Sequence, residues 1–593
     1  MRWTFREVPS EQVQSVAREI SAIPSLPRDP QSASILAKLL ISRGMESREA
    51  AELFLSPSLN HLHAPYLMTG MKSAIDRLDA AIERKEGILV YGDYDVDGTT
   101  AVVILKTAIE MCGGSADFHV PHRIREGYDL RGDVIERAAA AGIRLVISVD
   151  AGTRAFAAAE SARRAGVDLI ITDHHLPGPD GLPHAFAVVN PNQPGCEYPC
   201  KSLCGAGIAF KLAQALLEKR LPHRDQKQLL LSFMKVAAIA TIADSVPLAG
   251  ENRVIASLGL NALRSAVNPG LKALLEVAQL GGKPLSSGEV AFRIAPRINA
   301  AGRMDIARDV VDLFSVKDPQ RAREIAQRLD KLNGDRQEEE RSIVAAIEQR
   351  MAEDARLREA FCCVIDGDGW HRGVIGICAT RVVERYGRPA VVVTRDGEEA
   401  HGSGRSIPGF HLLNALESCA SLFSRFGGHA HAVGFSLPSQ KIADLRLQLD
   451  SYAKARLTLS DFEPALKIDA ELPLDAITPG LFDALSLLEP FGAGNPGPVF
   501  AGSAKIAAMP KILKEKHVVF RLAPGAQNGA GRSRAITLKA VGWRMAERLA
   551  VEKLLPGDLL EIAFTLERNE HPEFGGIELS LKDFRSPASQ TAK

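Results

Sequence analysis

The pattern of apolar and polar positions changes several times along the 593-residue chain. Residues 1–70 carry apolar residues at helical spacing, as in SASILAKLLISRG, and predict an N-terminal helical region. From 71 to 317, short β-rich runs alternate with alanine-rich helical stretches, which predicts a parallel α/β domain. The β-rich runs are ILVY, DFHV, RLVISV and DLIIT, at residues 88–91, 117–120, 144–149 and 168–172.

Four further regions follow the parallel domain. Residues 318–358 are highly charged, with apolar residues recurring at three and four, which is typical of a solvated helix that joins two domains. A second, smaller α/β domain is predicted at 359–455. Residues 456–585 are strand-like runs separated by turn residues and predict a small all-β barrel. Residues 586–593 are expected to be disordered. The fold class is therefore α/β multidomain with a C-terminal β-domain.

Composition narrows the class of protein. The 72 basic and 72 acidic residues balance, so a nucleic-acid partner would need local basic patches. No apolar run reaches membrane-spanning length and the first residues lack a signal peptide, so we expect a cytoplasmic protein without a membrane partner. Eight cysteines form no disulfide framework. Cys196, Cys200 and Cys204 are equally spaced, but no fourth ligand stands at a suitable spacing, so a metal site there is not favoured.

Acidic residues follow successive predicted strands. Asp95 and Asp97 follow 88–91, Asp150 follows 144–149, and the DHH triplet at 173–175 follows 168–172. The carboxyl ends of parallel strands meet at one edge of the sheet, and Asp244, after a helical stretch, could reach the same edge. A single aspartate of this kind could equally be a helix cap or turn former.

So many carboxylates in one cleft would repel one another unless cations neutralised them. Carboxylate oxygens with an imidazole suit Mn²⁺ or Mg²⁺. Two divalent metal ions bridged by a shared carboxylate can clamp a phosphate for in-line displacement. The residues therefore predict a two-metal phosphodiester-cleaving site.

The motifs resemble a known superfamily. GDYDVDG, VDAG, TDHH and ATIADSVPL resemble the four ordered motifs of the DHH phosphoesterases. PRINAAGRM, WHRGVIGI, GSGRS, FGGHAHAVGF and PFGAGNPGPVF resemble its single-strand-specific exonuclease branch in order and spacing. The resemblance implies a DHH domain, a connector helix, a DHHA1 domain and an OB-fold. Two positions depart from the family: Ala151 in VDAG, and Asp129, where the family often has glycine.

The resemblance also implies metal ligands. Asp95 would bind one ion and Asp97 the other, with Asp150 bridging them. His174 and Asp244 would complete the shell of the second ion.

Three neighbouring residues receive other roles from the same resemblance. Asp93 would be a ligand or an acid behind the ligands, and Asp173 would orient a histidine. His175 would contact the scissile phosphate or assist the leaving group.

Substrate-binding residues are implied in three places. In the DHHA1 domain they are His429, Arg405, Ser403, Gly427 and Gly428, and in PRINAAGRM they are Arg297, Asn299 and Arg303. Arg123 is a further candidate that could instead pair with surface acids. In the barrel, Trp543 stands among basic residues that include Lys514, Lys516, Arg532 and Arg534, which suits stacking on single-stranded DNA. The alternative is a solvated barrel face with a core tryptophan.

The resemblance implies a single-stranded-DNA-specific exonuclease that works 5′ to 3′, releases 5′-mononucleotides, and acts in DNA repair and recombination. A helicase and a single-strand DNA-binding protein are the expected partners. Two alternatives stay open. One is a phosphodiesterase of oligoribonucleotides or cyclic dinucleotides, whose relatives usually lack the connector and barrel. The other is an inactive scaffold that binds single strands.

Overall fold

The computed structural model describes residues 1–27, 29–123, 125–127, 129–304, 307–525, 536–569 and 575–586. The chain forms two compact units. The larger unit comprises residues 62–246 and 254–463, and the smaller unit comprises residues 1–61, 247–253 and 464–593. Arg532, Arg534 and all of the expected disordered tail except Ser586 lie outside the described residues.

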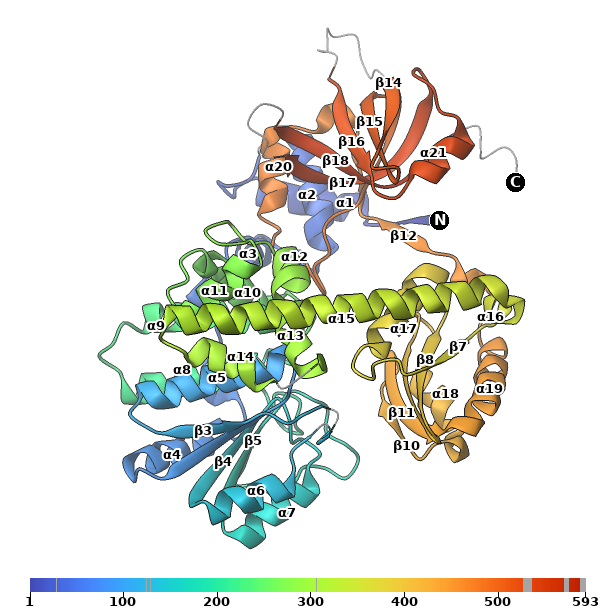
Figure 1. Cartoon of the computed structure of the whole chain (residues 1–593). Helices are drawn as coiled ribbons and strands as arrows, with labels where there is room; N and C mark the ends of the chain where they lie inside the picture. Colours follow the sequence, from blue (N-terminus) through green and yellow to red (C-terminus); the bar gives the residue numbers. More distant parts are fainter. Residues whose placement is uncertain are drawn as a thin grey trace. The chain divides into compact units, whose positions relative to one another are not determined.

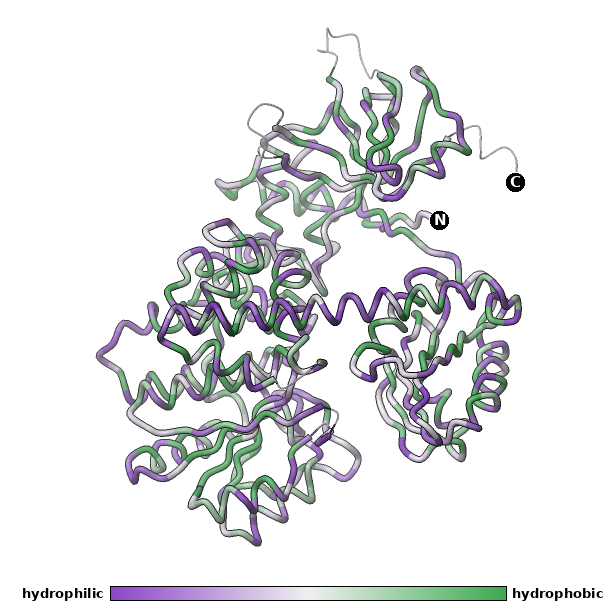
Figure 2. The backbone as a smooth tube through the Cα atoms, in the orientation of Figure 1, coloured by the Kyte–Doolittle hydropathy of each residue, from purple (hydrophilic) through white to green (hydrophobic). Residues whose placement is uncertain are grey.

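A five-stranded parallel sheet begins the larger unit (Figure 1). Its order is β3-β2-β4-β5-β6, and every neighbouring pair is parallel. The strands are β2 (Gly87–Gly92), β3 (Ala116–His119), β4 (Ile143–Val149), β5 (Asp168–Thr172) and β6 (Ala187–Val189). They are predominantly hydrophobic because helices cover both faces of the sheet (Figure 2).

Five helices accompany this sheet. They are α4 (Met71–Glu83), α5 (Val96–Met111), α6 (Gly132–Ala140), α7 (Phe156–Ala165) and α8 (Gly205–Arg220). Helices α6 and α7 pack on the face that presents Leu89, Val146 and Ile171. Helices α5 and α8 pack against each other and contact the central strands. The turns that lead from a strand to the following helix therefore lie together at the carboxyl ends of the strands.

A helical layer follows in the sequence. Its helices are α9 (Gln226–Ala243), α10 (Gly250–Leu263), α11 (Pro269–Val277), α12 (Ser287–Glu289), α13 (Ala295–Met304) and α14 (Arg308–Ser315), with one π-helical turn, η3 (Val290–Ile294). Contacts of α13 with α5 and α15 fix its position beside the start of α5.

The expected connecting helix is present as α15 (Pro319–Glu353). The Asp318 side chain caps it by accepting from the backbone N–H groups of Gln320 and Arg321. Its first half packs against α11 and α13. Its second half inserts Ile343, Ile347 and Met351 into a core of the second α/β domain. The helix is otherwise hydrophilic (Figure 2), as the charged sequence predicts.

The second α/β domain has a mixed sheet of order β10-β11-β9-β8-β7. Its strands are β7 (Cys363–Asp368), β8 (Ala390–Asp396), β9 (Glu399–Arg405), β10 (Arg425–Gly428) and β11 (Ala432–Pro438). Its helices are α16 (Ala355–Glu359), α17 (Ile375–Tyr386), α18 (Leu412–Glu417) and α19 (Ile442–Lys454). Only β7 and β8 run parallel; the other pairs are antiparallel.

The smaller unit contains a strand barrel of order β13-β14-β15-β16-β18-β17, which pairing of β14 with β17 closes. Its strands are β13 (Ala470–Glu471), β14 (Phe500–Leu513), β15 (His517–Pro524), β16 (Leu538–Gly542), β17 (Leu559–Asn569) and β18 (Gly576–Arg585), with α20 (Pro479–Ser486) and α21 (Ala546–Glu552). The predicted fold class, including the OB-type barrel, is confirmed.

The N-terminal segment packs with the barrel and forms no separate core. Its elements are β1 (Arg2–Phe5), α1 (Ser10–Ile20), α2 (Pro30–Ile41) and α3 (Arg48–Leu55). Strand β1 pairs in parallel with β12 (Ala465–Ile468), and buried residues of all three helices share one core with the barrel. Of the described helices, none is long and apolar enough to cross a membrane.

Candidate active site

Four turns of the parallel domain bring acidic and imidazole side chains together. Asp93, Asp95 and Asp97 follow β2, and Asp150 follows β4. Asp173, His174 and His175 follow β5, and Asp244 ends α9 as its C-cap. Because β2, β4 and β5 are adjacent and parallel, these turns meet at one edge of the sheet.

The side chains form overlapping groups that can each hold a metal ion. One group is Asp93, Asp95 and Asp150; another is Asp97, His174 and Asp244; a third is Asp150, Asp173, His174 and His175. Within each group the candidate ligand atoms lie within 4.8 Å of one another. His174 Nε2 lies 3.2 Å from Asp150 Oδ1 and 3.8 Å from Asp97 Oδ2. Asp150 and His174 each belong to two groups, and the contact between them places Asp150 beside the group of Asp97, His174 and Asp244.

The backbone holds Asp150 in an unusual conformation. Its φ is 60°, in the left-handed region that side chains other than glycine, asparagine and aspartate rarely adopt. Ser148 Oγ donates to the Ala151 carbonyl at 2.8 Å, and the Asp150 N–H donates to the Thr172 carbonyl at 3.0 Å. The first bond closes the turn after β4 and the second links this turn to β5, and together they hold the backbone that carries the Asp150 carboxylate.

Helix N-termini position Asp95 and Asp97. Asp97 accepts from the N–H groups of Gly205, at 2.6 Å, and Ala206, at 2.7 Å, at the start of α8. Asp95 caps α5 by accepting from the Gly98 N–H at 3.1 Å. Asn299 Oδ1 accepts from the Val96 N–H at 3.1 Å. The turn that carries these aspartates is therefore held from three sides.

Burial and mutual repulsion raise the pKa values of several aspartates in the cluster. Burial, aided by Asp97 and Asp95, raises the pKa of Asp244 to about 8. Burial also raises the pKa of Asp93 and of Asp150 well above the ordinary value, with nearby carboxylates adding to both shifts. Asp93 Oδ1 and Asp150 Oδ1 are buried and accept no hydrogen bond from the described residues. Carboxylate oxygens left in this state fit a divalent cation.

Asp173 and His175 form a distinct pair. Asp173 accepts from the Thr153 N–H at 2.9 Å and lies 2.7 Å from His175 Nδ1. Although burial opposes both shifts, this contact lowers the pKa of Asp173 and raises the pKa of His175 to about 9. His175 is therefore protonated at neutral pH, whereas burial lowers the pKa of His174, as suits a neutral metal ligand.

Metal-free protein should lose stability as the pH rises from about 4 to about 8. The raised carboxyl pKa values mean that the folded state binds protons more tightly than the unfolded state, whose aspartates titrate near about 3.9. Stability present below that pH is lost as each folded pKa is passed, by an amount on the order of a few kcal/mol. Because metal replaces these protons, Mn²⁺ should raise the Tm more at pH 8 than at pH 6.

Calorimetric unfolding with Mn²⁺ or with chelator at both pH values measures this effect. The Asp150→Asn variant, which removes a shared ligand, should show a smaller Mn²⁺ shift at pH 8. An equal Mn²⁺ shift at pH 6 and pH 8 in the unmodified protein would contradict the assignment of the raised pKa values to the metal site.

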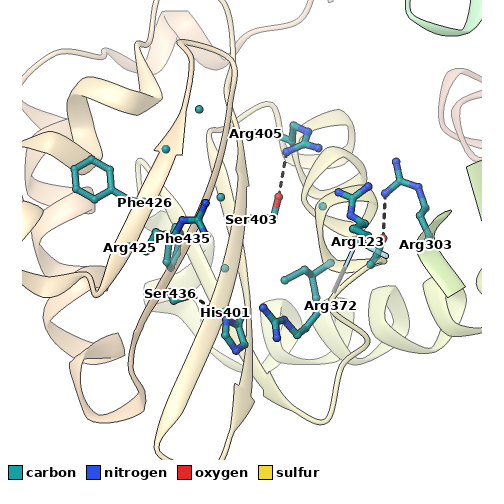
Figure 3. A pocket seen from close by; sticks show the side chains of 17 residues that line it. Arg123, Arg303, Arg372, His401, Ser403, Arg405, Arg425, Phe426, Phe435 and Ser436 are labelled. Atoms are coloured by element: carbon teal, nitrogen blue, oxygen red, sulfur yellow. Dashed lines mark hydrogen bonds between the residues drawn. The ribbon is translucent and has the colours of Figure 1, made fainter. Parts of the chain in front are cut away.

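An arginine-lined pocket of about 480 Å³ opens beside this cluster, between the parallel domain and the second α/β domain (Figure 3). Its cationic side chains are Arg123, Arg303, Arg372, Arg405 and Arg425, and His401, Ser403 and Ser436 also line it. Among the described residues no aspartate or glutamate lines it. Burial, with Arg123 and Arg405, lowers the pKa of Arg303 to about 10. Such crowded positive charge favours an anionic ligand.

The pocket adjoins the aspartate turn through Tyr94. The Arg123 guanidinium lies 4.9 Å from the Tyr94 ring centroid. Gly302 lies so close to the Tyr94 carbonyl that a Cβ there would be 2.3 Å from its oxygen. The next residue, Arg303, donates to the Gly373 carbonyl of the second domain at 3.0 Å. Arg405 donates to Ser403 Oγ at 3.2 Å.

Several expected substrate-binding residues lie elsewhere. Arg297 pairs with Asp330 of α15 at 2.8 Å, and the Asn299 side chain is used at the start of α5, so both have structural contacts. His429 is exposed and its Nδ1 accepts from the His431 N–H at 3.3 Å; it is not in the pocket lining, whereas Gly427 and Gly428 are. Trp543 belongs to the smaller unit and is 54% exposed, so the core-tryptophan alternative is wrong.

Other residues of the arginine-lined pocket were not predicted from the sequence. Arg372 stands in the WHRG motif and Arg425 directly precedes FGGH, but nothing in their spacing distinguishes them from other surface arginines. Asp129 stands where the family often has glycine and has a φ of 86°, so the family preference has a backbone cause. Cys196, Cys200 and Cys204 form no disulfide and belong to none of the metal-binding groups found among the described residues.

Comparisons with known proteins cover nearly the whole chain. Residues 87–241 match the DHH family, N-terminal domain; residues 359–455 match the DHHA1 domain; and residues 468–583 match the RecJ OB domain. The chain is 37% identical over 590 residues to the single-stranded-DNA-specific exonuclease RecJ of Bacillus subtilis, covering 98% of this chain and 70% of that one.

Two further similarities are close to full length. RecJ of Escherichia coli is 33% identical over 532 residues, covering 87% of this chain and 90% of its own. The crystal structure of RecJ in complex with Mn²⁺ from Thermus thermophilus matches with a TM-score of 0.80 and 28% identity, covering 99% of this chain and 80% of that one.

Proposed function

Because this chain belongs to the RecJ family of single-stranded-DNA-specific exonucleases, we propose that it hydrolyses single-stranded DNA from the 5′ end at two divalent metal ions. The observation that carries the proposal is the sharing of Asp150 between overlapping groups of metal ligands beside an arginine-lined pocket. Crystal structures of RecJ from Thermus thermophilus with Mn²⁺ and with Mg²⁺ support either ion as the cofactor.

Two of the groups supply the proposed ligands, and Asp150, whose Oδ1 lies 3.2 Å from His174 Nε2, is close enough to the second group to be shared. Asp93, Asp95 and Asp150 would hold one ion, and Asp97, His174 and Asp244 would hold the other, with Asp150 shared. When bound, such ions polarise the phosphoryl group and lower the pKa of water to produce the nucleophile. Asp93 Oδ1 and Asp150 Oδ1, which are buried and accept no hydrogen bond from the described residues, support this assignment.

His175 is the proposed proton donor. Its Nδ1 is engaged with Asp173, and its raised pKa of about 9 keeps a proton on Nε2 at neutral pH. That proton can stabilise the scissile phosphate or pass to the departing 3′ oxygen. Asp173 fixes the ring and its charge, as a positioning residue.

The arginine-lined pocket gives a physical reason for 5′ polarity. A terminal phosphate carries more negative charge than an internal phosphodiester, so Arg123, Ser403 and Arg405 would select a strand end. Arg123 lies against Tyr94, next to Asp93 and Asp95, which brings the bound phosphate close to the metal ligands. A short distance between the terminal phosphate and the reaction centre supports release of mononucleotides.

The barrel supplies a second contact for longer strands. Trp543 is exposed, and its ring packs edge-on against His517 at 4.8 Å. The nearby turn between β14 and β15 presents Lys514 and Lys516, and the strand before it exposes Ile512. Aromatic faces with basic neighbours bind single strands by stacking and phosphate contact.

Trp543→Ala should weaken binding of a strand of several tens of nucleotides by roughly 5- to 150-fold, because stacking contributes about 1–3 kcal/mol per base. Cleavage of very short strands should be unchanged. Fluorescence anisotropy titrations measure the affinity. Leu53→Ala removes a hydrophobic side chain of the same exposure, 54%, from α3 and is the matched control. Unchanged affinity in the Trp543 variant would remove this residue from the DNA-binding surface.

Digestion of end-labelled strands tests the function. With Mn²⁺, a 5′ label should appear at once as mononucleotide, while a 3′ label should pass through progressively shorter strands. Immediate release of the 3′ label would overturn the proposed polarity. Parallel digestions of blunt duplex and RNA should be slow. Rapid cleavage of a dinucleotide with no cleavage of long strands would favour the oligonucleotide phosphodiesterase, and absence of any hydrolysis would favour the inactive scaffold.

The cellular setting follows from the substrate. We propose that a helicase and a single-strand DNA-binding protein supply the strand during repair and recombination. The eight cysteines, all of which lie in the described part of the chain, form no disulfide, which suits a reducing cytoplasm.

A further inference from the structure

The arginine-lined pocket holds more positive charge than one terminal phosphate needs. Arg123, Arg405 and Ser403 suffice for the terminal phosphate of the proposed function, and a phosphate monoester carries about −1.5 to −2 charges. Arg372 and Arg425 also line the pocket. Both are exposed, and neither has an acidic partner within 4 Å among the described residues.

Sheet register shows that the additional groups form a second row. Ser403 of β9 pairs with Gly434 of β11, and Gly434 pairs with Gly427 of β10. Two residues along, His401 pairs with Ser436, and Ser436 pairs with Arg425. Side chains two residues apart in a strand point to the same face and lie about 7 Å apart along it. Figure 3 shows His401, Ser436 and Arg425 on one side of the pocket and Arg405 and Arg123 on the other.

The second row is suited to an anion. His401 Nδ1 lies 3.0 Å from Ser436 Oγ, which orients both polar groups. Burial, together with nearby Arg372, lowers the pKa of His401, although Glu399 Oε2 lies 3.6 Å from His401 Nε2. The first row is formed by Ser403, Gly434 and Gly427. Because two of its three residues are glycines, no side chain of Gly427 or Gly434 blocks the path between the rows. A volume of 480 Å³ lies in the range of pockets that hold whole small molecules.

We infer that Arg372, Arg425, His401 and Ser436 form a subsite for the second and third phosphates of a 5′-triphosphorylated strand. The inference rests on the proposed function, because the first phosphate must occupy the Arg123–Arg405 site. Each additional phosphate brings at least one further negative charge to arginines that lack an acid.

The subsite predicts a specific product. Water attacks the phosphorus between the first and second nucleotides, the bond to the 3′ oxygen of the first nucleotide breaks, and that oxygen takes up a proton. The attacked phosphate stays on the shortened strand as its new 5′ phosphate. The triphosphate is untouched and leaves on the first nucleotide, so the first turnover releases a nucleoside 5′-triphosphate.

Binding of three oligodeoxynucleotides that differ only at the 5′ end tests the inference. Full-length protein is titrated with 5′-hydroxyl, 5′-monophosphate and 5′-triphosphate strands in chelator, which prevents cleavage. We expect the triphosphate strand to bind about tenfold more tightly than the monophosphate strand. Arg425→Ala and Arg372→Ala should each reduce that advantage, because each should lower the affinity for the triphosphate strand by a larger factor than the affinity for the monophosphate strand. Lys441→Ala, at an exposed residue outside the pocket lining, is the charge-matched control.

The outcomes separate the inference from the proposed function. Equal or weaker binding of the triphosphate strand, relative to the monophosphate strand, overturns the inference. Equal binding of hydroxyl and monophosphate strands overturns the terminal-phosphate site. With Mn²⁺, mass spectrometry of the first product gives a second criterion. A nucleoside triphosphate supports the subsite, whereas a triphosphorylated dinucleotide would mean that the second row holds a nucleotide and would overturn the inference. Inorganic triphosphate should compete with the triphosphate strand for wild type more effectively than for Arg425→Ala.

Discussion

Asp150→Asn should reduce hydrolysis of single-stranded DNA by about 10³-fold or more. The shared carboxylate is the ligand that both proposed ions need, and metal ions supply several kcal/mol of transition-state stabilisation, each 1.36 kcal/mol of which is a factor of ten in rate. Asparagine has nearly the same shape and tolerates the left-handed backbone at φ 60°, so the fold should survive. Single-turnover digestion with saturating Mn²⁺ measures the effect.

A matched control is available on the same sheet. Asp117 of β3 is exposed, and Asp117→Asn makes the same chemical change away from the metal-binding groups. Its rate should equal that of wild type. Affinity for single-stranded DNA in chelator should change little in either variant, because neither side chain lines the arginine pocket. Near-normal turnover by Asp150→Asn would rule out a shared ligand at this position.

Gly205→Ala should reduce turnover by about 10²-fold, even though alanine ordinarily favours a helix over glycine. A Cβ at this first residue of α8 would lie 2.4 Å from Asp150 Cβ and 2.7 Å from Asp150 Cγ. The Asp150 carboxylate must then move, and a displacement of about 1 Å is enough for a loss of this size. The Gly205 N–H also donates to Asp97, so both predicted ligands would be disturbed.

Gly207 of the same helix provides the comparison. A Cβ there would first meet the flexible end of Leu203, at 3.3 Å from Cδ2, so Gly207→Ala should retain activity. Both variants are assayed by single-turnover digestion, and Mn²⁺ affinity is measured by calorimetric titration. Weaker Mn²⁺ binding is expected for Gly205→Ala only. If both variants turned over like wild type, the close approach of α8 to Asp150 would have no part in arranging the site.

The acid cluster was predictable because strand order carries information about position. Asp95, Asp97 and Asp150 each follow an apolar run, and parallel strands place such residues at one edge of the sheet. The connecting helix was equally predictable from its charged, amphipathic sequence. Both predictions rest on local sequence patterns, which do not depend on contacts between distant residues.

Other features depend on contacts between distant residues. The N-terminal helices share a core with barrel strands more than 400 residues away, which helical periodicity cannot reveal. Arg297 and Asn299 stand in a motif with Arg303, yet only Arg303 lines the pocket, because successive helix residues point in different directions. Arg372 and Arg425 join the pocket through the register of β9, β10 and β11, which was not readable from composition or spacing.

The proposed activity depends on two metal ions that share Asp150 in the acid cluster. Crystals of the protein with Mn²⁺, measured at the manganese absorption edge, test it most directly. We predict two anomalous peaks, one beside Asp93 and Asp95 and one beside Asp97, His174 and Asp244, with the Asp150 carboxylate contacting both. A single peak, or two peaks of which only one touches Asp150, would contradict the sharing of Asp150 by two ions.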